Sequence, residues 1–197
     1  MALIQLDHVP ETVQFCLPLY LIVPDPGQIK SLPINQRKVL YLLHGLSDDG
    51  SAWVRYSMIE TIARDYGLVV VMPSVERSFY ANLPNGQNFY TYLVEELPAY
   101  LESLFGLAPR REDSLIAGLS MGGYGALKVG LNLPERFAAV ASLSGLTSLE
   151  FLNLYPDDPR NEKFAHMFGN LDNLIGSPHD PLIWLQNAAQ RNTDLPN

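Results

Sequence analysis

The stretch 117–126 reads AGLSMGGYGA, which places Ser120 between Gly118 and Gly122. An apolar run at 114–117 precedes it, and small residues at helical spacing follow it. This is the sequence form of a nucleophile elbow, a strand-to-helix turn that holds a serine in a strained backbone conformation. Side chains two positions to either side would collide with the crossing strand and helix, and glycine removes them. We therefore predict that Ser120 is a catalytic nucleophile; an ordinary glycine turn is the competing interpretation.

Apolar runs and helical patterns alternate along the chain, as they do where helices pack on both faces of a mostly parallel sheet. We expect strands at 3–9, 17–23, 39–43, 68–72, 114–117 and 138–143. We expect helices at 51–66, at 88–105, from the elbow to about 131, at 162–168 and at 182–191. The first two strands are expected to be antiparallel, and Pro98 should kink or divide its helix because proline removes a backbone donor. The pattern predicts the α/β class, with a mostly parallel sheet, helices on both faces and a single domain spanning 1–197.

The bulk composition excludes several classes of protein. Thirteen basic against 21 acidic residues give a net charge of −8, which repels phosphate backbones and anionic lipid, so neither nucleic acid nor a membrane is expected as a partner. Nowhere do about 18 apolar residues run together, as a membrane helix requires. Cys16 is the only cysteine, which excludes an internal disulfide and a thiolate metal cluster. Residues 1–10 lack the basic segment of a signal peptide, so a cytoplasmic protein is expected.

A serine hydroxyl is a poor nucleophile at neutral pH, so Ser120 needs a base to take its proton and donors to stabilise an oxyanion. We assign one donor to the backbone N–H of Met121, at the positive end of the elbow helix. The second should come from the loop after an earlier strand, and we assign it to the N–H of Leu46, next to Gly45. His44 is either the base or, as we favour, a residue that holds this loop by hydrogen bonding.

At these residues the chain resembles the α/β-hydrolase superfamily, and within it the esterase D-like group of small carboxylesterases, especially the tributyrin (acetyl) esterases. The matching segments are 41–47, 69–73, 95–98, 117–126 and 142–145. The resemblance implies an acyl-enzyme mechanism without cofactor or metal, and a small-molecule ester with a short acyl chain as substrate. Hydrolysis of S-formylglutathione or of feruloyl sugars uses the same machinery and stays an alternative. The sequence leaves open both a monomer and a homo-oligomer.

The other two members of a catalytic triad are hard to find in the sequence. In this superfamily an acid and then a histidine follow the serine, each after a further strand. Only His166 and His179 lie downstream of Ser120, with acids at Asp157, Asp158, Asp172 and Asp180, and none ends a strand-like run. The resemblance places the acid and the histidine beyond Asn197. We therefore expect a C-terminally truncated domain that lacks the last strands, with the strand at 138–143 left as an exposed edge. A natural short variant is the alternative.

Two interpretations of function follow from this pattern. The first is a serine carboxylesterase whose acyl and alcohol pockets are walled by the loop 73–87 and the weakly patterned region 148–181. Trp53, Phe79 and Tyr80 are candidate pocket residues, although core or surface packing explains them equally well. The second is a noncatalytic binding or structural module that has kept the fold and lost the base.

Overall fold

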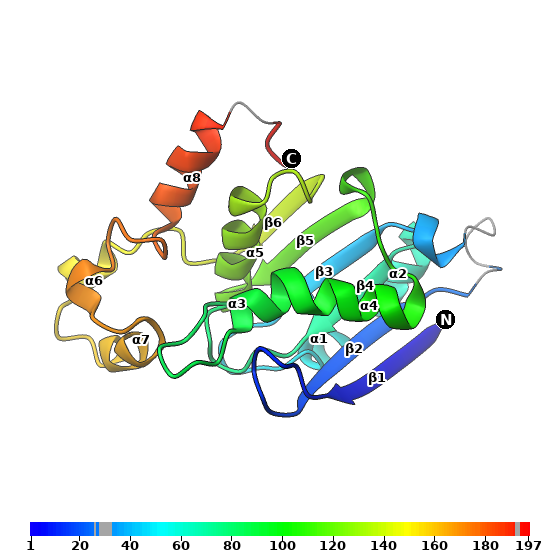
Figure 1. Ribbon diagram of the computed structural model, residues 1–197, viewed down its shortest axis with the longest axis horizontal. Helices are drawn as coiled ribbons and strands as arrows, with labels where there is room; N and C mark the ends of the chain where they lie inside the picture. Colours follow the sequence, from blue (N-terminus) through cyan, green and yellow to red (C-terminus); the bar gives the residue numbers. More distant parts are fainter. Residues whose placement is uncertain (26, 28–32, 192–193) are drawn as a thin grey trace.

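The computed structural model describes residues 1–25, 27, 33–191 and 194–197 and shows one twisted sheet with helices on both sides (Figure 1). The order of its strands is β1-β2-β4-β3-β5-β6. The strands are β1 (Ala2–His8), β2 (Leu17–Val23), β3 (Val39–Leu43), β4 (Val69–Pro73), β5 (Ser114–Leu119) and β6 (Ala139–Leu143). Each expected strand is therefore present, with ends that differ by no more than a few residues.

Pairing within the sheet is antiparallel at one edge and parallel elsewhere. The strands β1 and β2 form the expected antiparallel pair, with Leu6 opposite Leu19, and β2 also runs antiparallel to β4. The strands β3, β4, β5 and β6 are parallel to one another. Side chains on β3 and β4 are almost all buried, because helices cover both faces of a parallel sheet. The α/β class with a mostly parallel sheet is confirmed.

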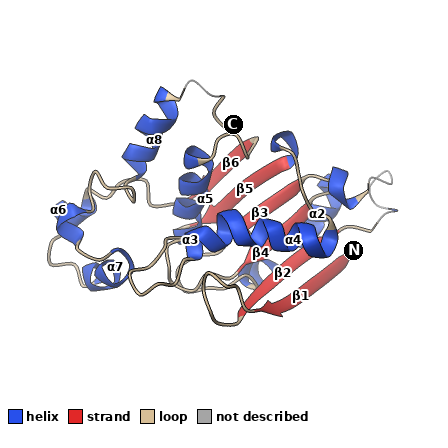
Figure 2. Cartoon of the chain, in the orientation of Figure 1, coloured by secondary structure: helices blue, strands red, loops and turns tan. Residues whose placement is uncertain are grey.

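The helices divide between the two faces (Figure 2). On one face, α2 packs Ile59 and Ala63 against Leu42 and Met72 of the sheet. On the other face, α4 and α5 cover the larger core, which contains Leu97, Tyr124 and their neighbours. The helices are α1 (Ala52–Tyr56), α2 (Ile59–Tyr66), α3 (Phe89–Thr91), α4 (Leu97–Phe105), α5 (Met121–Asn132), α6 (Phe151–Leu154), α7 (Arg160–Phe168) and α8 (Pro181–Gln190).

The helix expected at 51–66 is two helices rather than one. The break falls at Ser57, whose backbone is extended at φ −137° and ψ 175°. The Ser57 hydroxyl donates to the carbonyl of Trp53 and accepts a hydrogen bond from the Ile59 N–H at 3.2 Å. A serine that satisfies the end of one helix and the start of the next can stop a helix inside an apolar periodicity. The helical spacing alone does not reveal such a stop.

The helix expected at 88–105 is divided near Pro98, as predicted. A π-helical segment, η3 (Tyr92–Glu96), separates α3 from α4, and Pro98 lies in the first turn of α4. Proline cannot donate to the carbonyl four residues before it, which is that of Val94. The guanidinium group of Arg136 donates to this carbonyl instead. A distant arginine thus satisfies the acceptor that the proline leaves open.

The chain after β6 forms short helices, of which α6 was not expected. In the part of the chain that the structure describes, no strand follows β6, although Asn197 begins to pair with it. The Asn197 N–H donates to the Ala138 carbonyl at 3.0 Å, and its carbonyl accepts from the Val140 N–H at 2.9 Å. The edge of β6 that we expected to be exposed is therefore partly covered.

Candidate active site

Ser120 occupies the turn between β5 and α5. Its backbone has φ 55° and ψ −112°, and the residue is exposed. Its N–H donates to the Leu143 carbonyl at 2.8 Å, and its carbonyl accepts from the Tyr124 N–H at 3.0 Å. Both backbone groups of Ser120 are therefore held by the sheet and the helix. The strained conformation persists because its surroundings fix it on both sides.

The glycines of the elbow lie where no side chain fits. A Cβ atom added to Gly118 would lie 2.2 Å from the Gly122 carbonyl oxygen, and one added to Gly122 would lie 2.2 Å from the Leu43 oxygen. The steric reason given for these glycines is thus confirmed. Gly45 is close to the serine, since a Cβ built on it would lie 4.0 Å from the Ser120 Cβ.

Two backbone N–H groups, one at the turn and one in the loop after β3, have no acceptor among the described residues. Met121 is the first residue of α5, where an amide has no acceptor within the helix. Neither the N–H of Met121 nor that of Leu46 donates to a partner among the residues that the structure describes. The dipole of α5 adds positive potential at the Met121 end. These groups have the chemistry that an oxyanion site needs.

His44 holds the loop that carries Leu46. Its ring is buried, with Nδ1 2.8 Å from the Gly45 carbonyl and Nε2 accepting from the Val75 N–H at 3.0 Å. Since Nε2 accepts, the proton is on Nδ1, which donates to Gly45. Burial lowers the pKa of His44, so this neutral form persists at neutral pH. Both ring nitrogens are occupied, which supports the loop-holding role over that of a base for Ser120.

The downstream histidines make no hydrogen bond to Ser120 in the described part of the chain. His166 lines a cleft, and His179 packs on Phe168 with ring centroids 4.9 Å apart. Burial, and then the charge of Lys128, lowers the pKa of His179 to about 4. Its Nδ1 is buried without a hydrogen-bond partner among the described residues.

Two of the candidate acids have structural partners. Asp180 caps α8, because its Oδ1 accepts from the Leu182 N–H at 3.0 Å and its Oδ2 from the Gly176 N–H at 2.8 Å. Asp158 pairs with Arg160 at 2.6 Å. No contact to Ser120 is found for Asp157 or Asp172 either within the described ranges, so the structure brings none of the candidate triad partners to the serine.

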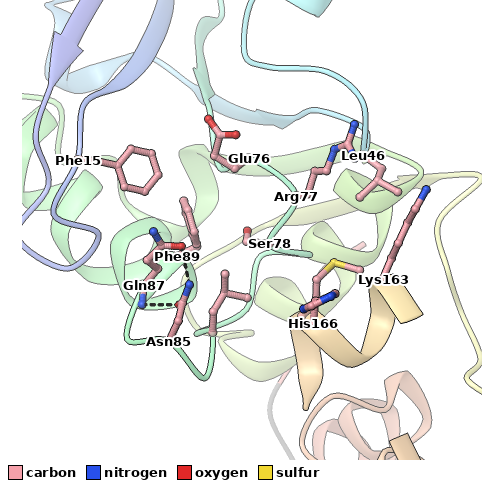
Figure 3. A pocket seen from close by; sticks show the side chains of 12 residues that line it. Phe15, Leu46, Glu76, Arg77, Ser78, Asn85, Gln87, Phe89, Lys163 and His166 are labelled. Atoms are coloured by element: carbon pink, nitrogen blue, oxygen red, sulfur yellow. Dashed lines mark hydrogen bonds between the residues drawn. The ribbon is translucent and has the colours of Figure 1, made fainter. Parts of the chain in front are cut away.

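A cleft of about 720 Å³ opens beside the Leu46 loop (Figure 3). Its walls come from the loop after β4 and from α7, which are the two regions expected to form pockets. It is lined by Phe15, Leu46, Glu76, Arg77, Ser78, Leu83, Asn85, Gln87, Phe89, Lys163, His166 and Met167. Apolar and charged side chains are thus mixed along this cleft.

A second hollow, of about 120 Å³, lies on the Gly45 side of the loop. It is lined by His44, Gly45, Asp48, Ala52, Trp53, Tyr56, Ser57 and Leu119. Trp53 is therefore a pocket residue, as proposed. Phe79 and Tyr80 are buried, with exposed fractions of 5% and 0%, so of the two interpretations left open for them, core packing applies and a pocket role does not.

Lys128 is a buried cation that we did not expect from the sequence. Its ammonium group donates to the Tyr80 carbonyl at 3.2 Å and lies 4.9 Å from the centre of the Tyr90 ring. Burial lowers its pKa from 10.5 to about 7. The sequence does hold a signal, since Lys128 follows Ala126 and Leu127 and precedes Val129 on the elbow helix.

The free energy of unfolding is expected to rise with pH between about 7 and 9, below the range in which the tyrosines of the unfolded chain lose their protons. Folded Lys128 loses its proton near pH 7, whereas the unfolded chain keeps it to about 10.5, so the unfolded state binds more protons in this window and stability increases with pH. The slope from this group is at most about 1.4 kcal/mol per pH unit. Lys128→Met should abolish the slope and raise stability near neutral pH. Urea unfolding across this range measures both effects, and equal slopes in the two proteins would contradict the prediction.

Neither a metal centre nor a membrane span is found in residues 1–25, 27, 33–191 and 194–197. No three His, Cys, Asp or Glu side chains in these ranges lie together as metal ligands would. No helix in them has the length and apolar character needed to cross a membrane.

A strained serine between a parallel strand and a helix, with the loop at Gly45 close to it, defines a serine hydrolase of the α/β-hydrolase fold. Residues 21–196 match the model of the family described as putative esterase, and the chain belongs to that family.

Known proteins agree with this assignment. An acetyl esterase of Caldicellulosiruptor saccharolyticus is 31% identical over 179 residues, which cover 88% of this chain and 67% of that protein. The fluorophosphonate-binding serine hydrolase FphF of Staphylococcus aureus, solved with substrate bound, has a TM-score of 0.86 and 34% identity, covering 99% of this chain and 76% of its own. The S-formylglutathione hydrolase FrmB of the same organism has a TM-score of 0.84 and 33% identity, covering 100% of this chain and 77% of its own. The chain spans about 60 to 67% of the length of the curated relatives that it matches.

Proposed function

We propose that the complete protein is a serine carboxylesterase that hydrolyses short-chain acyl esters through an acyl-enzyme. Ser120 attacks the ester carbonyl, and the N–H groups of Leu46 and Met121 stabilise the oxyanion of the tetrahedral intermediate. The alcohol leaves, and water then releases the acyl group from the serine. The observation that carries this proposal is the exposed Ser120 at φ 55°, followed by the Met121 amide, which has no partner in the described residues, and close to Gly45 of the loop that carries Leu46.

We further propose that the base and its orienting acid come from residues outside 1–197. Ser120 must lose a proton as it attacks, and the four histidines of the chain are His8, His44, His166 and His179. His8 and His44 are hydrogen-bonded to other groups. His166 and His179 form no hydrogen bond to Ser120 in the described part of the chain. Asn197 begins a parallel pairing with β6, which fits a further strand at that edge.

The small hollow beside Gly45 and the large cleft beside Leu46 suggest where the acyl group and the leaving group of a substrate bind. A volume of about 120 Å³ equals that of about four waters in the liquid, which suits a short acyl group. The cleft of about 720 Å³ suits a larger leaving alcohol or thiol. Similarity to an acetyl esterase supports a short acyl chain, and similarity to an S-formylglutathione hydrolase keeps a thioester as the alternative.

A fluorophosphonate probe tests the proposal on the protein expressed from its complete coding sequence. We expect rapid covalent labelling at Ser120, identified by mass spectrometry of the peptide that contains it, and no labelling of Ser120→Ala. The probe needs an activated serine and a formed oxyanion site, so both halves of the proposal are tested. A protein that stays unlabelled would instead be the noncatalytic remnant of the fold.

A further inference from the structure

We propose that Tyr80 is a positioning residue for the oxyanion site, acting as a brace between the elbow helix and the loop that presents the Leu46 N–H. This inference rests on the proposed function, because it assigns a catalytic consequence to a residue that cannot touch the substrate. Tyr80 is completely buried. Its effect must therefore pass through the groups that it contacts.

The hydroxyl of Tyr80 reaches the oxyanion loop directly. It donates to the His44 carbonyl at 3.0 Å. The same carbonyl lies against the start of the elbow helix, since a Cβ built on Gly122 would come within 2.8 Å of it. One carbonyl thus lies between the helix that carries Met121 and the hydroxyl of Tyr80.

The ring of Tyr80 packs against the next turn of that helix. A Cβ built on Gly125 would lie 2.5 Å from the ring carbon Cδ2. Only glycine lets the ring approach the helix backbone this closely. Tyr80 therefore fixes the spacing between α5 and the loop at 44–46, and with it the spacing of the two proposed oxyanion donors.

The direction of the Leu46 N–H follows from two fixed peptide groups. The His44 imidazole holds the Gly45 carbonyl, and in a planar trans peptide the N–H of Leu46 points opposite to that carbonyl. The preceding peptide, between His44 and Gly45, is held through its own carbonyl by Tyr80. The Gly45 carbonyl also accepts from the Asp48 N–H at 3.2 Å, so the peptide that carries the Leu46 N–H keeps two restraints. Loss of the Tyr80 hydrogen bond removes the restraint on the peptide before it, and Gly45, which has no side chain, lets that peptide turn relative to the next one.

The backbone of Tyr80 is itself held in a strained state. Phe79 and Tyr80 both have φ 51°, a conformation that costs an L-residue about 1 kcal/mol or more. The Tyr80 N–H donates to the Ser78 hydroxyl at 3.1 Å, and its carbonyl accepts from buried Lys128 at 3.2 Å. A buried ammonium group is a costly means of holding a loop. The buried ammonium group of Lys128 is explained if catalysis depends on where Tyr80 is held.

The test compares Tyr80→Phe with a matched control in the complete protein. Tyr80→Phe keeps the ring and removes the hydroxyl. Tyr92→Phe also removes the hydroxyl of a completely buried tyrosine, one that lies 3.1 Å from His8 Nε2 on the edge strand β1, which β2 and β4 separate from β3. With a short p-nitrophenyl ester, we expect Tyr80→Phe to lower kcat about tenfold with KM within about twofold, and Tyr92→Phe to leave kcat unchanged. The Ki of a trifluoromethyl ketone, which mimics the tetrahedral intermediate, should rise about tenfold in Tyr80→Phe alone.

Lys128→Met supplies a second, independent variant. It removes the donor to the Tyr80 carbonyl, so kcat should fall about threefold while the protein becomes more stable near neutral pH. General loosening of the structure cannot explain lower turnover in a more stable protein. If Tyr80→Phe does not fold, this variant decides the question.

Three results would overturn the proposed role of Tyr80. They are an unchanged kcat in both Tyr80→Phe and Lys128→Met, an equal loss of kcat in Tyr92→Phe, or a rise in KM of Tyr80→Phe with kcat unchanged. Failure of the proposed function has a different signature, because Ser120→Ala would then keep the activity of the wild type.

Discussion

Ser120→Ala is expected to lower kcat/KM of the complete protein for a short p-nitrophenyl ester by at least about 10⁴-fold. The reason is that the acyl-enzyme cannot form without the hydroxyl, and only binding and oxyanion stabilisation continue to assist water. Stability should change little, because Ser120 is exposed and its two hydrogen bonds come from the backbone.

Steady-state hydrolysis and thermal unfolding of the same samples measure this prediction. Ser103→Ala is the matched control, since Ser103 is an exposed serine on α4. It should hydrolyse the ester as the wild type does. If Ser120→Ala retained more than about a tenth of the activity, another nucleophile would be responsible.

The sequence predicts those parts of the fold that local physics determines. The strands β3 and β4 are continuous apolar runs, and the helix ending at Gly67 stops where a left-handed residue is needed. The division of the helix at 51–66 was not predicted, because it depends on a single hydroxyl at Ser57. The π-helical segment also escapes sequence patterns, since Arg136, which satisfies the Val94 carbonyl, is 42 residues away.

The candidate site shows the same division between local and distant determinants. A glycine-serine pattern predicts the elbow at Ser120, because sterics within a few residues demand it. The support of the oxyanion loop comes from Val75 and Tyr80, which lie 31 and 36 residues after His44. Sequence spacing carries no sign of such bonds, and the aromatic character of Tyr80 suggests only packing. The sequence therefore predicts the nucleophile but not the groups that position its partners.

Gly122→Ala is expected to destabilise the protein by about 3 kcal/mol and to lower kcat at least about 100-fold. The added methyl group would lie 2.2 Å from the Leu43 oxygen and 2.8 Å from the His44 oxygen, and both are backbone atoms that cannot rotate away. Relief requires α5 to move from the end of β3, which displaces the Met121 N–H from the loop that carries Leu46. Because the oxyanion donors act together, a shift of about 1 Å between them removes most of their effect.

Gly106→Ala separates this clash from the ordinary cost of replacing a glycine. Gly106 ends α4 at φ 65°, and a Cβ added there meets nothing within 4 Å. It should cost about 1 kcal/mol through backbone strain and leave kcat unchanged. Urea unfolding gives both stabilities, and titration with a fluorophosphonate gives the fraction of active protein to which kcat refers. If Gly122→Ala matched Gly106→Ala in stability and in kcat, the close contact of α5 with β3 would not be what positions the oxyanion donors.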